Sequence, residues 1–429
     1  MPRTPFTAFP AQLNEFLSEG GGRVSPVHIL LIHQVFVRPQ DPGGTRHFEF
    51  AQQLVRRGHQ VTVLAGTRSY LTGELLGADR RQTLEPGLEV VRSWVLGGAG
   101  RGAFGRMMAF ASFVVSAFLA GLRIPAVSLI WGTSPPLSQA WTAWALARMK
   151  GAPWLLEVRD LWPAFAVQMG VMRNRAVIAL ARWLERFLYR RADRIVLNSP
   201  GFISHLLASG AEASKLAFVP NGVDTQLFDP AAEGGELRRL AGLERKFIAL
   251  YAGAHGMAND LWQLLAAAEI LREDPRIAFV LVGDGREKVA LQAKVRAVGL
   301  SNVIFLPPVE KARVPNLLVD ADCGLVVLKP IPLFTTTYPN KMFDYMAAGK
   351  PVVLALDGVA RRLVEEADAG VCVPPGDPPA LAAALRELAG DPALARKLGQ
   401  RGRVYVETHY DRAQLALQME GLMRDLAGQ

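Results

Sequence analysis

The sequence predicts an α/β protein with two doubly wound parallel sheets that face each other. Strand and helix patterns alternate through most of the 429 residues, which is typical of α/β architecture. The strands read as continuous apolar runs, as expected when helices cover both faces of a parallel sheet. A chain of this length exceeds one ordinary core, so two domains are expected.

The first domain is expected over residues 27–228. It opens with an apolar strand at 27–36, followed by a Gly-Gly turn, a helix at 45–58 and a second strand at 59–66. Further strands are predicted at "VSLIWG", "PWLLEV", "RIVLNS" and "KLAFVPN". Residues 1–26 have no clear periodicity and lack the basic start and apolar stretch of a signal peptide. We therefore predict a loosely ordered extension there.

The second domain is expected over residues 229–408, because the pattern restarts after a break that contains Pro230 and a Gly-Gly pair. Strands are predicted at "FIALYAGA", "IAFVLVGDG", "NVIFLPPV", "CGLVVLKP" and "KPVVLAL", with a helix at "NDLWQLLAAAEILRE". Ligands of doubly wound sheets bind outside the carboxyl ends of the strands. The cleft between the two domains is therefore the predicted site.

The net charge of +9 and the pI near 9.7 favour phosphorylated substrates, anionic membrane or nucleic acid as partners. No finger, RRM or KH motif is present, and the arginines are not interleaved with aromatic residues on strands. Nucleic acid is therefore not expected as a partner. The two cysteines, Cys323 and Cys372, lie in separate apolar runs, which indicates buried thiols in a reducing cytoplasm.

Two segments bear on membrane binding. The uncharged run from Met107 to Leu122 has sixteen residues, whereas a spanning helix needs about twenty, so a buried or interfacial helix is expected. Arginines recur every four residues farther along: Arg182, Arg186, Arg190 and Arg194. An apolar stripe lies on the opposite side of the same helix: Leu180, Trp183, Leu184, Phe187 and Leu188. The helix could present a solvated outer face or dock on an anionic leaflet.

Three short motifs are candidates for ligand contacts. In "DPGGTRHFEFA", Gly43 and Gly44 would let backbone N–H groups approach a phosphate at a helix start; the alternative is a tight turn with Thr45 as N-cap. "LVGDGREK" holds half of a dinucleotide fingerprint, and its Asp284 could bind a base edge or ribose, or simply form a turn. "DAD" (320–322) is not expected to bind metal, because no further acidic ligand stands near it in the sequence.

The segments "GTSPPLSQAWTAWALAR", "LEVRDLWPAFAVQMG", "VPNGVDTQLFDP" and "YPNKMFDYMAAGKPVV" resemble, in this order, the retaining glycosyltransferases of family 4. The likeness runs from Val27 to the C-terminus and is greatest to the branch with the fucosaminyl transferases of bacterial O-antigen and capsule assembly. It implies the GT-B fold, two Rossmann-like domains with a nucleotide-sugar donor in the cleft, and no required metal or cofactor. The last segment, 409–429, would then be a helix that crosses back to the first domain.

The resemblance also assigns donor contacts. An acidic residue of the family's "E-A-M-A-x-G"-type helix binds the donor ribose, and Asp344 holds that position. The helix start before it would offer free N–H groups and a positive dipole end to the diphosphate. These residues are Asn340, Lys341, Met342 and Phe343. Lys341 would add a full charge; the alternative is an ordinary first-turn surface lysine.

The sequence departs from the family pattern at three places. Thr336 stands where the first of two family glutamates is usual, which leaves the sugar contact of that glutamate without its usual residue. The second domain lacks the usual early basic pair and offers His255 instead. Arg159 and Asp160 replace a His-Asp pair: Arg159 could neutralise the leaving diphosphate or hold the acceptor, and Asp160 could hold the acceptor or cap the next turn.

These observations predict a cytoplasmic enzyme, peripheral on the inner face of the membrane, that transfers a sugar to a lipid-linked saccharide with retention. Lys341, Arg159 and Gly44 are the predicted catalytic groups. Three alternatives stay open: an inverting transferase that uses His33 as base, a sugar-nucleotide 2-epimerase, and a membrane-bound scaffold without catalysis. The last would not bind a nucleoside diphosphate.

Overall fold

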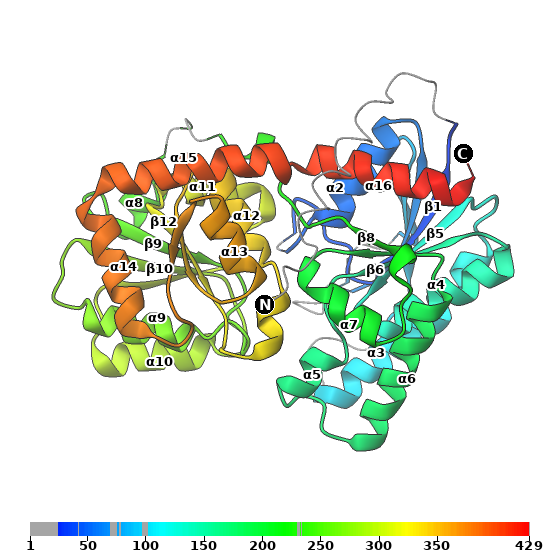
Figure 1. Ribbon diagram of the computed structural model, residues 1–429, viewed down its shortest axis with the longest axis horizontal. Coiled ribbons are helices and arrows are strands. Elements are labelled where there is room, and N and C mark those ends of the chain that lie inside the picture. Colours follow the sequence, from blue (N-terminus) through cyan, green and yellow to red (C-terminus); the bar gives the residue numbers. More distant parts are fainter. Residues whose placement is uncertain are drawn as a thin grey trace, which may run out of the picture.

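The computed structural model describes residues 25–41, 43–68, 75–76, 79–96, 102–229, 232 and 234–428. They form two α/β units that lie side by side (Figure 1). The predicted fold class is confirmed, since each unit is built on a largely parallel sheet covered by helices. The extension predicted at 1–26 lies, except for Ser25 and Pro26, outside the described residues.

The first sheet has eight strands in the order β3-β4-β2-β1-β5-β6-β7-β8. Their bounds are β1 (His28–Ile32), β2 (Gln60–Gly66), β3 (Arg81–Glu85), β4 (Leu88–Ser93), β5 (Leu129–Ser134), β6 (Trp154–Val158), β7 (Arg194–Leu197) and β8 (Leu216–Phe218). Only β3 among these runs antiparallel, paired with β4. The β3–β4 hairpin is absent from the sequence prediction, because β3 is polar and largely exposed and lacks the apolar run of a central strand.

The helices of the first unit pack on both faces of its sheet. They are α2 (Arg46–Arg56), α3 (Gly102–Leu122), α4 (Leu137–Lys150), α5 (Ala164–Gln168), α6 (Arg175–Arg191) and α7 (Ile203–Ala208). The apolar run at 107–122 lies on α3, which packs against α4. Within the described part of the chain, no helix combines the length and apolar content that crossing a bilayer requires.

The second sheet has six parallel strands in the order β11-β10-β9-β12-β13-β14. The strands are β9 (Phe247–Ala252), β10 (Ile277–Val282), β11 (Val303–Leu306), β12 (Cys323–Val327), β13 (Val352–Ala355) and β14 (Gly370–Cys372). The helices are α8 (Glu236–Ala241), α9 (Leu261–Ile270), α10 (Lys288–Val298), α11 (Val314–Asp320), α12 (Asn340–Ala347), α13 (Val359–Glu366), α14 (Pro378–Gly390) and α15 (Pro392–His409).

The last helix, α16 (Arg412–Ala427), leaves the second unit and packs on α2 of the first. Leu415, Met419 and Met423 are buried there, in a cluster with side chains of β1 and β2. Figure 1 shows α15 and α16 running one after the other along the same edge of both units. The chain therefore passes between the units twice, after β8 and before α16.

Candidate active site

The loops after the carboxyl ends of the two sheets contact each other. Pro39, after β1, accepts a hydrogen bond from Ala312 N–H at 3.2 Å. Phe165, after β6, stacks on Phe334 with ring centroids 5.4 Å apart. Ser199 Oγ, after β7, donates to the carbonyl oxygen of Thr336. The two carboxyl-terminal edges thus meet, as the prediction of a shared site requires.

The glycine loop before α2 lies against the start of α12. Gly43 has φ of +142°, a conformation that favours glycine. A Cβ placed on Gly44 would lie 3.8 Å from Asn340 Nδ2 of the other unit. Thr45 makes no side-chain cap hydrogen bond; its hydroxyl donates to Glu49 instead. The structure therefore brings two predicted phosphate-binding segments together, and the tight turn is not closed by a Thr45 cap.

Lys341 points from α12 to the end of β9. Its Nζ lies 3.6 Å from the ring centroid of Tyr251, and a Cβ on Gly253 would lie 2.9 Å from that nitrogen. Burial lowers the pKa of Lys341 to about 7, against the opposing effect of Asp344. A half-buried ammonium on an aromatic face differs from the solvated first-turn lysine that the sequence left as an alternative.

The other residues at the start of α12 differ in their exposure to solvent. Asn340 is exposed, whereas the side chains of Met342 and Phe343 are fully buried in the core. Met342 N–H also donates to Pro339 O at 3.1 Å, so the prediction of a free N–H at Met342 is wrong.

Asp344 accepts a hydrogen bond from Lys311 Nζ at 2.7 Å. Lys311 comes from a short turn after β11, and its ammonium also lies 5.6 Å from the ring centroid of Phe228. Sequence reasoning missed this lysine, which is 33 positions away from its partner. The carboxylate predicted to bind ribose is therefore oriented by a cation before any ligand arrives.

The loop after β10 contributes Asp284. Its carboxylate is exposed and accepts a hydrogen bond from Gly285 N–H at 2.7 Å. The backbone of His255 is joined to this loop by its N–H, which donates to Asp284 O at 2.8 Å. The His255 ring is buried, and both its nitrogens are without partner in the described part of the chain. Burial lowers its pKa to about 4.

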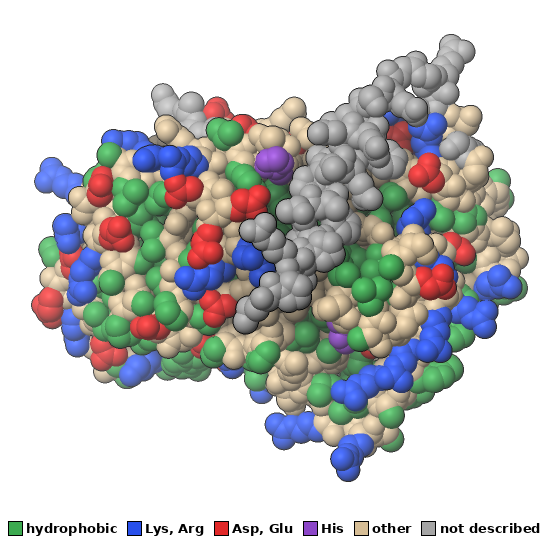
Figure 2. Space-filling view, in the orientation of Figure 1, with side chains coloured by type: hydrophobic (Ala, Val, Ile, Leu, Met, Phe, Trp, Pro, Cys, Tyr) green, Lys and Arg blue, Asp and Glu red, His purple; other side chains and the backbone are tan. Residues whose placement is uncertain are grey.

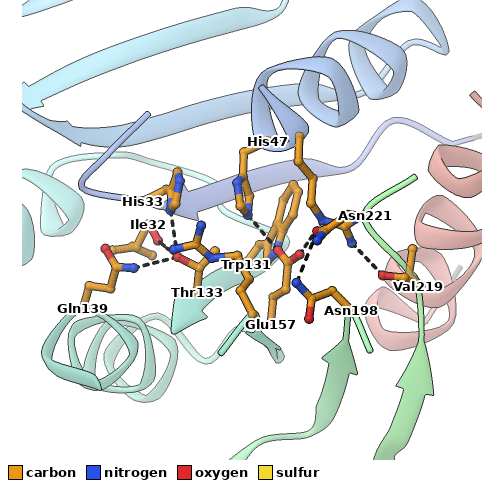
Figure 3. A network of polar contacts seen from close by, with 12 residues as sticks. Ile32, His33, His47, Trp131, Thr133, Gln139, Glu157, Asn198, Val219 and Asn221 are labelled. Carbon is orange, nitrogen blue, oxygen red and sulfur yellow. Dashed lines mark hydrogen bonds and ion pairs between the residues drawn. The ribbon is translucent and has the colours of Figure 1, made fainter. Parts of the chain in front are cut away.

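On the first unit, a buried polar network joins α2 to β5 and β6 (Figure 3). Its centre is Glu157 of β6, whose side chain is 0% exposed. The carboxylate accepts hydrogen bonds from Arg46 Nε at 2.7 Å, His47 Nε2 at 2.8 Å and Trp131 Nε1 at 3.0 Å. Burial alone would raise the pKa of Glu157, but Arg46, His47 and Arg159 together hold it well below its usual value.

His33 closes one side of this network. Its ring lies 3.9 Å from that of His47, centroid to centroid, and its Nδ1 is 2.9 Å from Thr133 Oγ1. Gln139 also donates to that hydroxyl, at 2.7 Å. Burial, His47 and Arg159 lower the pKa of His33 well below its normal value. His33 is therefore a neutral, enclosed imidazole.

Arg159 and Asp160 follow directly after the carboxyl end of β6. Arg159 Nη2 donates to Pro135 O at 3.0 Å, and its buried Nε has no partner among the described residues. Asp160 is exposed at the surface, but many protein atoms surround its carboxylate. The resulting loss of hydration raises its pKa to about 6, against the opposing effect of Arg159. No side-chain bond to the next turn is present there; Trp162 N–H donates to the Asp160 backbone carbonyl.

The "DAD" motif at 320–322 has a structural role. Asp320 accepts hydrogen bonds from the N–H groups of Gly235 and Leu237 at the start of α8. Asp322 pairs with Arg238 at 2.7 Å. Among the residues whose positions are described, no group of three or more His, Cys, Asp or Glu could hold a metal ion.

The predicted arginine stripe is only partly correct. Helix α6 ends at Arg191, because Ala192 has an extended conformation (ψ 138°), and Arg194 lies on β7. The stripe is therefore limited to Arg182, Arg186 and Arg190. The apolar stripe is not packed inward throughout, since Leu180 is 63% and Trp183 60% exposed.

Two family models match the chain. Residues 43–222 match the glycosyl transferase 4-like domain, and residues 246–391 match glycosyl transferases group 1. "Putative colanic acid biosynthesis glycosyl transferase WcaI" of Escherichia coli (strain K12) is 27% identical over 398 residues, 89% of this chain and 96% of that protein. "Probable glycosyltransferase WbjE" of Pseudomonas aeruginosa is 27% identical over 292 residues, 65% and 70% of the two chains.

Solved structures share the fold over nearly the whole chain. Sucrose-phosphate synthase from Thermosynechococcus elongatus superposes with a TM-score of 0.77 at 21% identity, covering 94% of this chain and 99% of its own. Anabaena Alr3699/HepE in complex with UDP and glucose gives 0.69 at 19% identity, covering 93% and 100%. The expected GT-B fold is thereby confirmed.

Proposed function

The chain belongs to the glycosyltransferases of family 4, and on this premise we propose that it transfers a sugar from a nucleotide diphosphate sugar to a hydroxyl of a lipid-linked saccharide, with retention of configuration. The observation that carries the proposal is the meeting of Gly44 with the start of α12, beside the half-buried ammonium of Lys341. The name of WcaI, a putative colanic acid biosynthesis glycosyl transferase, supports a role in polysaccharide biosynthesis.

The diphosphate would be held between the two units. Its departure develops negative charge, so fixed positive groups should carry most of the catalysis. Lys341, the first turn of α12 and the glycine loop supply such groups at one junction. Arg159 would add a second cation from the first unit. In this proposal, charge neutralisation comes from these side chains and requires no metal and no organic cofactor.

Asp344 would receive the ribose hydroxyls of the donor. Lys311 occupies one carboxylate oxygen, Oδ1, at 2.7 Å, and the other oxygen can accept from a hydroxyl. The same contact keeps the carboxylate in a fixed orientation, which lowers the entropy lost when the donor binds. Asp284, exposed on the neighbouring loop, would contact the base or ribose from the other side.

Retention is favoured over inversion by the surroundings of His33. A general base needs a pKa near the operating pH and access to the acceptor proton. His33 is buried, bonded to Thr133, in contact with the His47 ring, and has a lowered pKa. A donor phosphate oxygen, on the same face as the incoming hydroxyl, would take the proton instead.

The function is tested with a panel of nucleotide sugars and a membrane extract as acceptor source. We expect one nucleotide to raise the melting temperature, slow hydrolysis of its sugar without acceptor, and unchanged activity in excess EDTA. NMR of the product should show the donor's anomeric configuration. An inverted linkage that His33→Ala abolishes would support the inverting alternative, and the absence of any nucleotide-induced shift would support the scaffold.

We also propose peripheral docking on the inner face of the cytoplasmic membrane. Trp144 of α4 packs edge-on against Phe187 of α6, whose ring stacks on the exposed Trp183. Lys and Arg side chains lie beside hydrophobic ones over the part of Figure 2 where these helices project. Residues 90–156 hold no Asp or Glu, so little repulsion from anionic lipid arises there. Aromatic side chains with arginine are typical of interfacial binding.

The double variant Arg182→Gln/Arg186→Gln should lower binding to phosphatidylglycerol vesicles. Each arginine near the surface contributes about 1 kcal/mol, so the partition coefficient should fall about 30-fold in a flotation assay. The matched control is Lys294→Gln/Arg296→Gln, which removes two exposed cations from α10. Equal losses in both variants, or equal binding to neutral vesicles, would contradict docking through α6.

A further inference from the structure

Four consecutive carbonyl groups of the linker after β8 accept hydrogen bonds from two buried arginines. Arg46 donates to the oxygens of Val219, at 2.9 Å, and Pro220. Arg412 donates to those of Asn221, at 3.1 Å, and Gly222, at 2.5 Å. Arg46 belongs to α2, and Arg412 is the first residue of α16. The linker is therefore fixed by side chains from two different helices.

Each arginine is fixed in turn by a carboxylate. Arg46 pairs with Glu157, and Arg412 Nη1 lies 2.5 Å from Glu49 Oε2. Glu49 belongs to the first turn of α2, and its other oxygen accepts from the Thr45 hydroxyl. Only Thr45 separates this turn from Gly44. The glycine loop, the start of α2 and the linker are thus held as one assembly.

The assembly lies where the chain passes between the units. Val223 N–H donates to Tyr410 O, and Arg412 N–H donates to Val223 O, both at 2.9 Å. The outgoing linker and the returning chain are therefore bonded side by side, next to the arginine that Glu49 binds. Any rotation of the second unit about this crossing must act on Arg412.

The positive charge of Lys311, in the second unit, also affects the pKa of Glu49. Burial alone would raise its pKa, but Arg412, the Thr45 hydrogen bond and Lys311 lower it. Lys311 is the partner of Asp344 on α12. One ion pair thus lies on α12, Asp344 with Lys311, and another at the crossing, Glu49 with Arg412.

We propose that Glu49 and Arg412 are positioning residues of the transfer reaction. They fix the glycine loop relative to the second unit, so that Gly44 and Lys341 face the same diphosphate. The inference rests on the proposed function, because it assigns that diphosphate to the junction of the two units. A displacement of about 1 Å between reacting groups can cost about 100-fold in rate, which makes such an anchor kinetically important.

Glu420 is a natural control for a merely structural role. It is a buried glutamate that, like Glu49, joins α16 to the first unit, and it is bonded to Arg57 and to His59 Nε2 at 2.9 Å. These partners lie beyond the other end of α2, remote from the glycine loop. Glu49→Gln and Glu420→Gln therefore each remove one carboxylate that joins α16 to the first unit, partly buried at Glu49 and buried at Glu420.

The test compares steady-state kinetics of both variants, with melting temperatures measured in parallel. We expect similar losses of stability, but kcat/KM about tenfold lower for Glu49→Gln and within twofold of wild type for Glu420→Gln. Arg412→Lys keeps the positive charge but loses the paired hydrogen bonds to the carbonyl oxygens of Asn221 and Gly222. Its kinetics should therefore resemble those of Glu49→Gln. Glu49→Asp should recover part of the activity.

A second readout separates this inference from the proposed function. Small-angle X-ray scattering without ligand should show a changed distance distribution for Glu49→Gln and none for Glu420→Gln. If wild type binds no nucleoside diphosphate, the proposed function fails while this measurement still tests the anchor. Unchanged scattering, or equal kinetic losses in the Glu49 and Glu420 variants, would overturn the inference.

Discussion

Lys341→Met is expected to lower kcat/KM by roughly 10- to 150-fold, the equivalent of about 1.5–3 kcal/mol for a charge-assisted hydrogen bond. Since charge on the leaving diphosphate grows in the transition state, kcat should fall more than donor affinity. Methionine keeps the volume of the side chain and its contact with Tyr251. The loss would therefore report the missing ammonium rather than a cavity.

The same variant should melt at a higher temperature than wild type. In the free protein the Lys341 ammonium is half-buried, its pKa is lowered to about 7 by burial, and the Tyr251 ring face is its nearest compensation. Below pH 7 the lysine is protonated in both folded and unfolded states, so this cost is present in full. Between pH 7 and 10.5 the unfolded state binds the extra proton, so wild-type stability rises with pH. The advantage of Lys341→Met should be largest below pH 7.

A pH profile makes this prediction sharper. The donor diphosphate requires the protonated lysine, so kcat/KM for the donor should fall as pH rises through about 7. This descending limb should be missing in Lys341→Met. The control is Lys294→Met on α10, where the lysine is exposed, and its activity should be unchanged. Wild-type activity in Lys341→Met, together with an unchanged pH profile, would remove Lys341 from the donor site.

The predicted strands correspond to observed ones wherever a buried parallel strand leaves an apolar run, as in β1, β9 and β10. Polar β3 left no such signal. The spacing of the arginines led to a wrong end for helix α6. The four-residue period continues in the sequence past Arg191, although the helix ends there. Local pattern thus locates an element better than it locates its end.

The position of the site follows from topology, but its pairings do not. Gly44, Arg159 and Lys341 follow the carboxyl ends of parallel strands, and the loops at these ends meet at the junction of the two units. Lys311 and Asp344 are 33 positions apart, and Arg46 and Glu157 are 111 apart. Only the folded chain brings such residues together. For Glu157, the available signal was an acidic residue within the apolar strand "WLLEV". Since a charge is rarely buried without a partner, such a residue implies a buried partner of opposite charge.

Glu157→Gln should destabilise the first unit by about 3–5 kcal/mol, since it leaves the buried guanidinium of Arg46 without its carboxylate. The glutamine can still accept one hydrogen bond from His47 or Trp131. Urea denaturation followed by tryptophan fluorescence is a suitable measurement, because Trp131 itself contacts residue 157. Glu185→Gln is the matched control: Glu185 is equally enclosed, but its partners are Tyr189 and His205 rather than arginine or lysine. Its loss should be about 1–3 kcal/mol.

The pH dependence and a double variant separate charge pairing from packing. The pKa of Glu157 is held well below its usual 4.5, so its contribution is complete above that pH and is lost as the pH falls toward the folded value. The stability difference between wild type and Glu157→Gln should therefore be constant from about pH 5 to 8 and shrink in acid. Arg46→Met in the Glu157→Gln background removes the unpaired guanidinium and should recover part of the loss. No recovery, or a loss no larger than that of Glu185→Gln, would mean that the Arg46–Glu157 pair contributes only as packed volume.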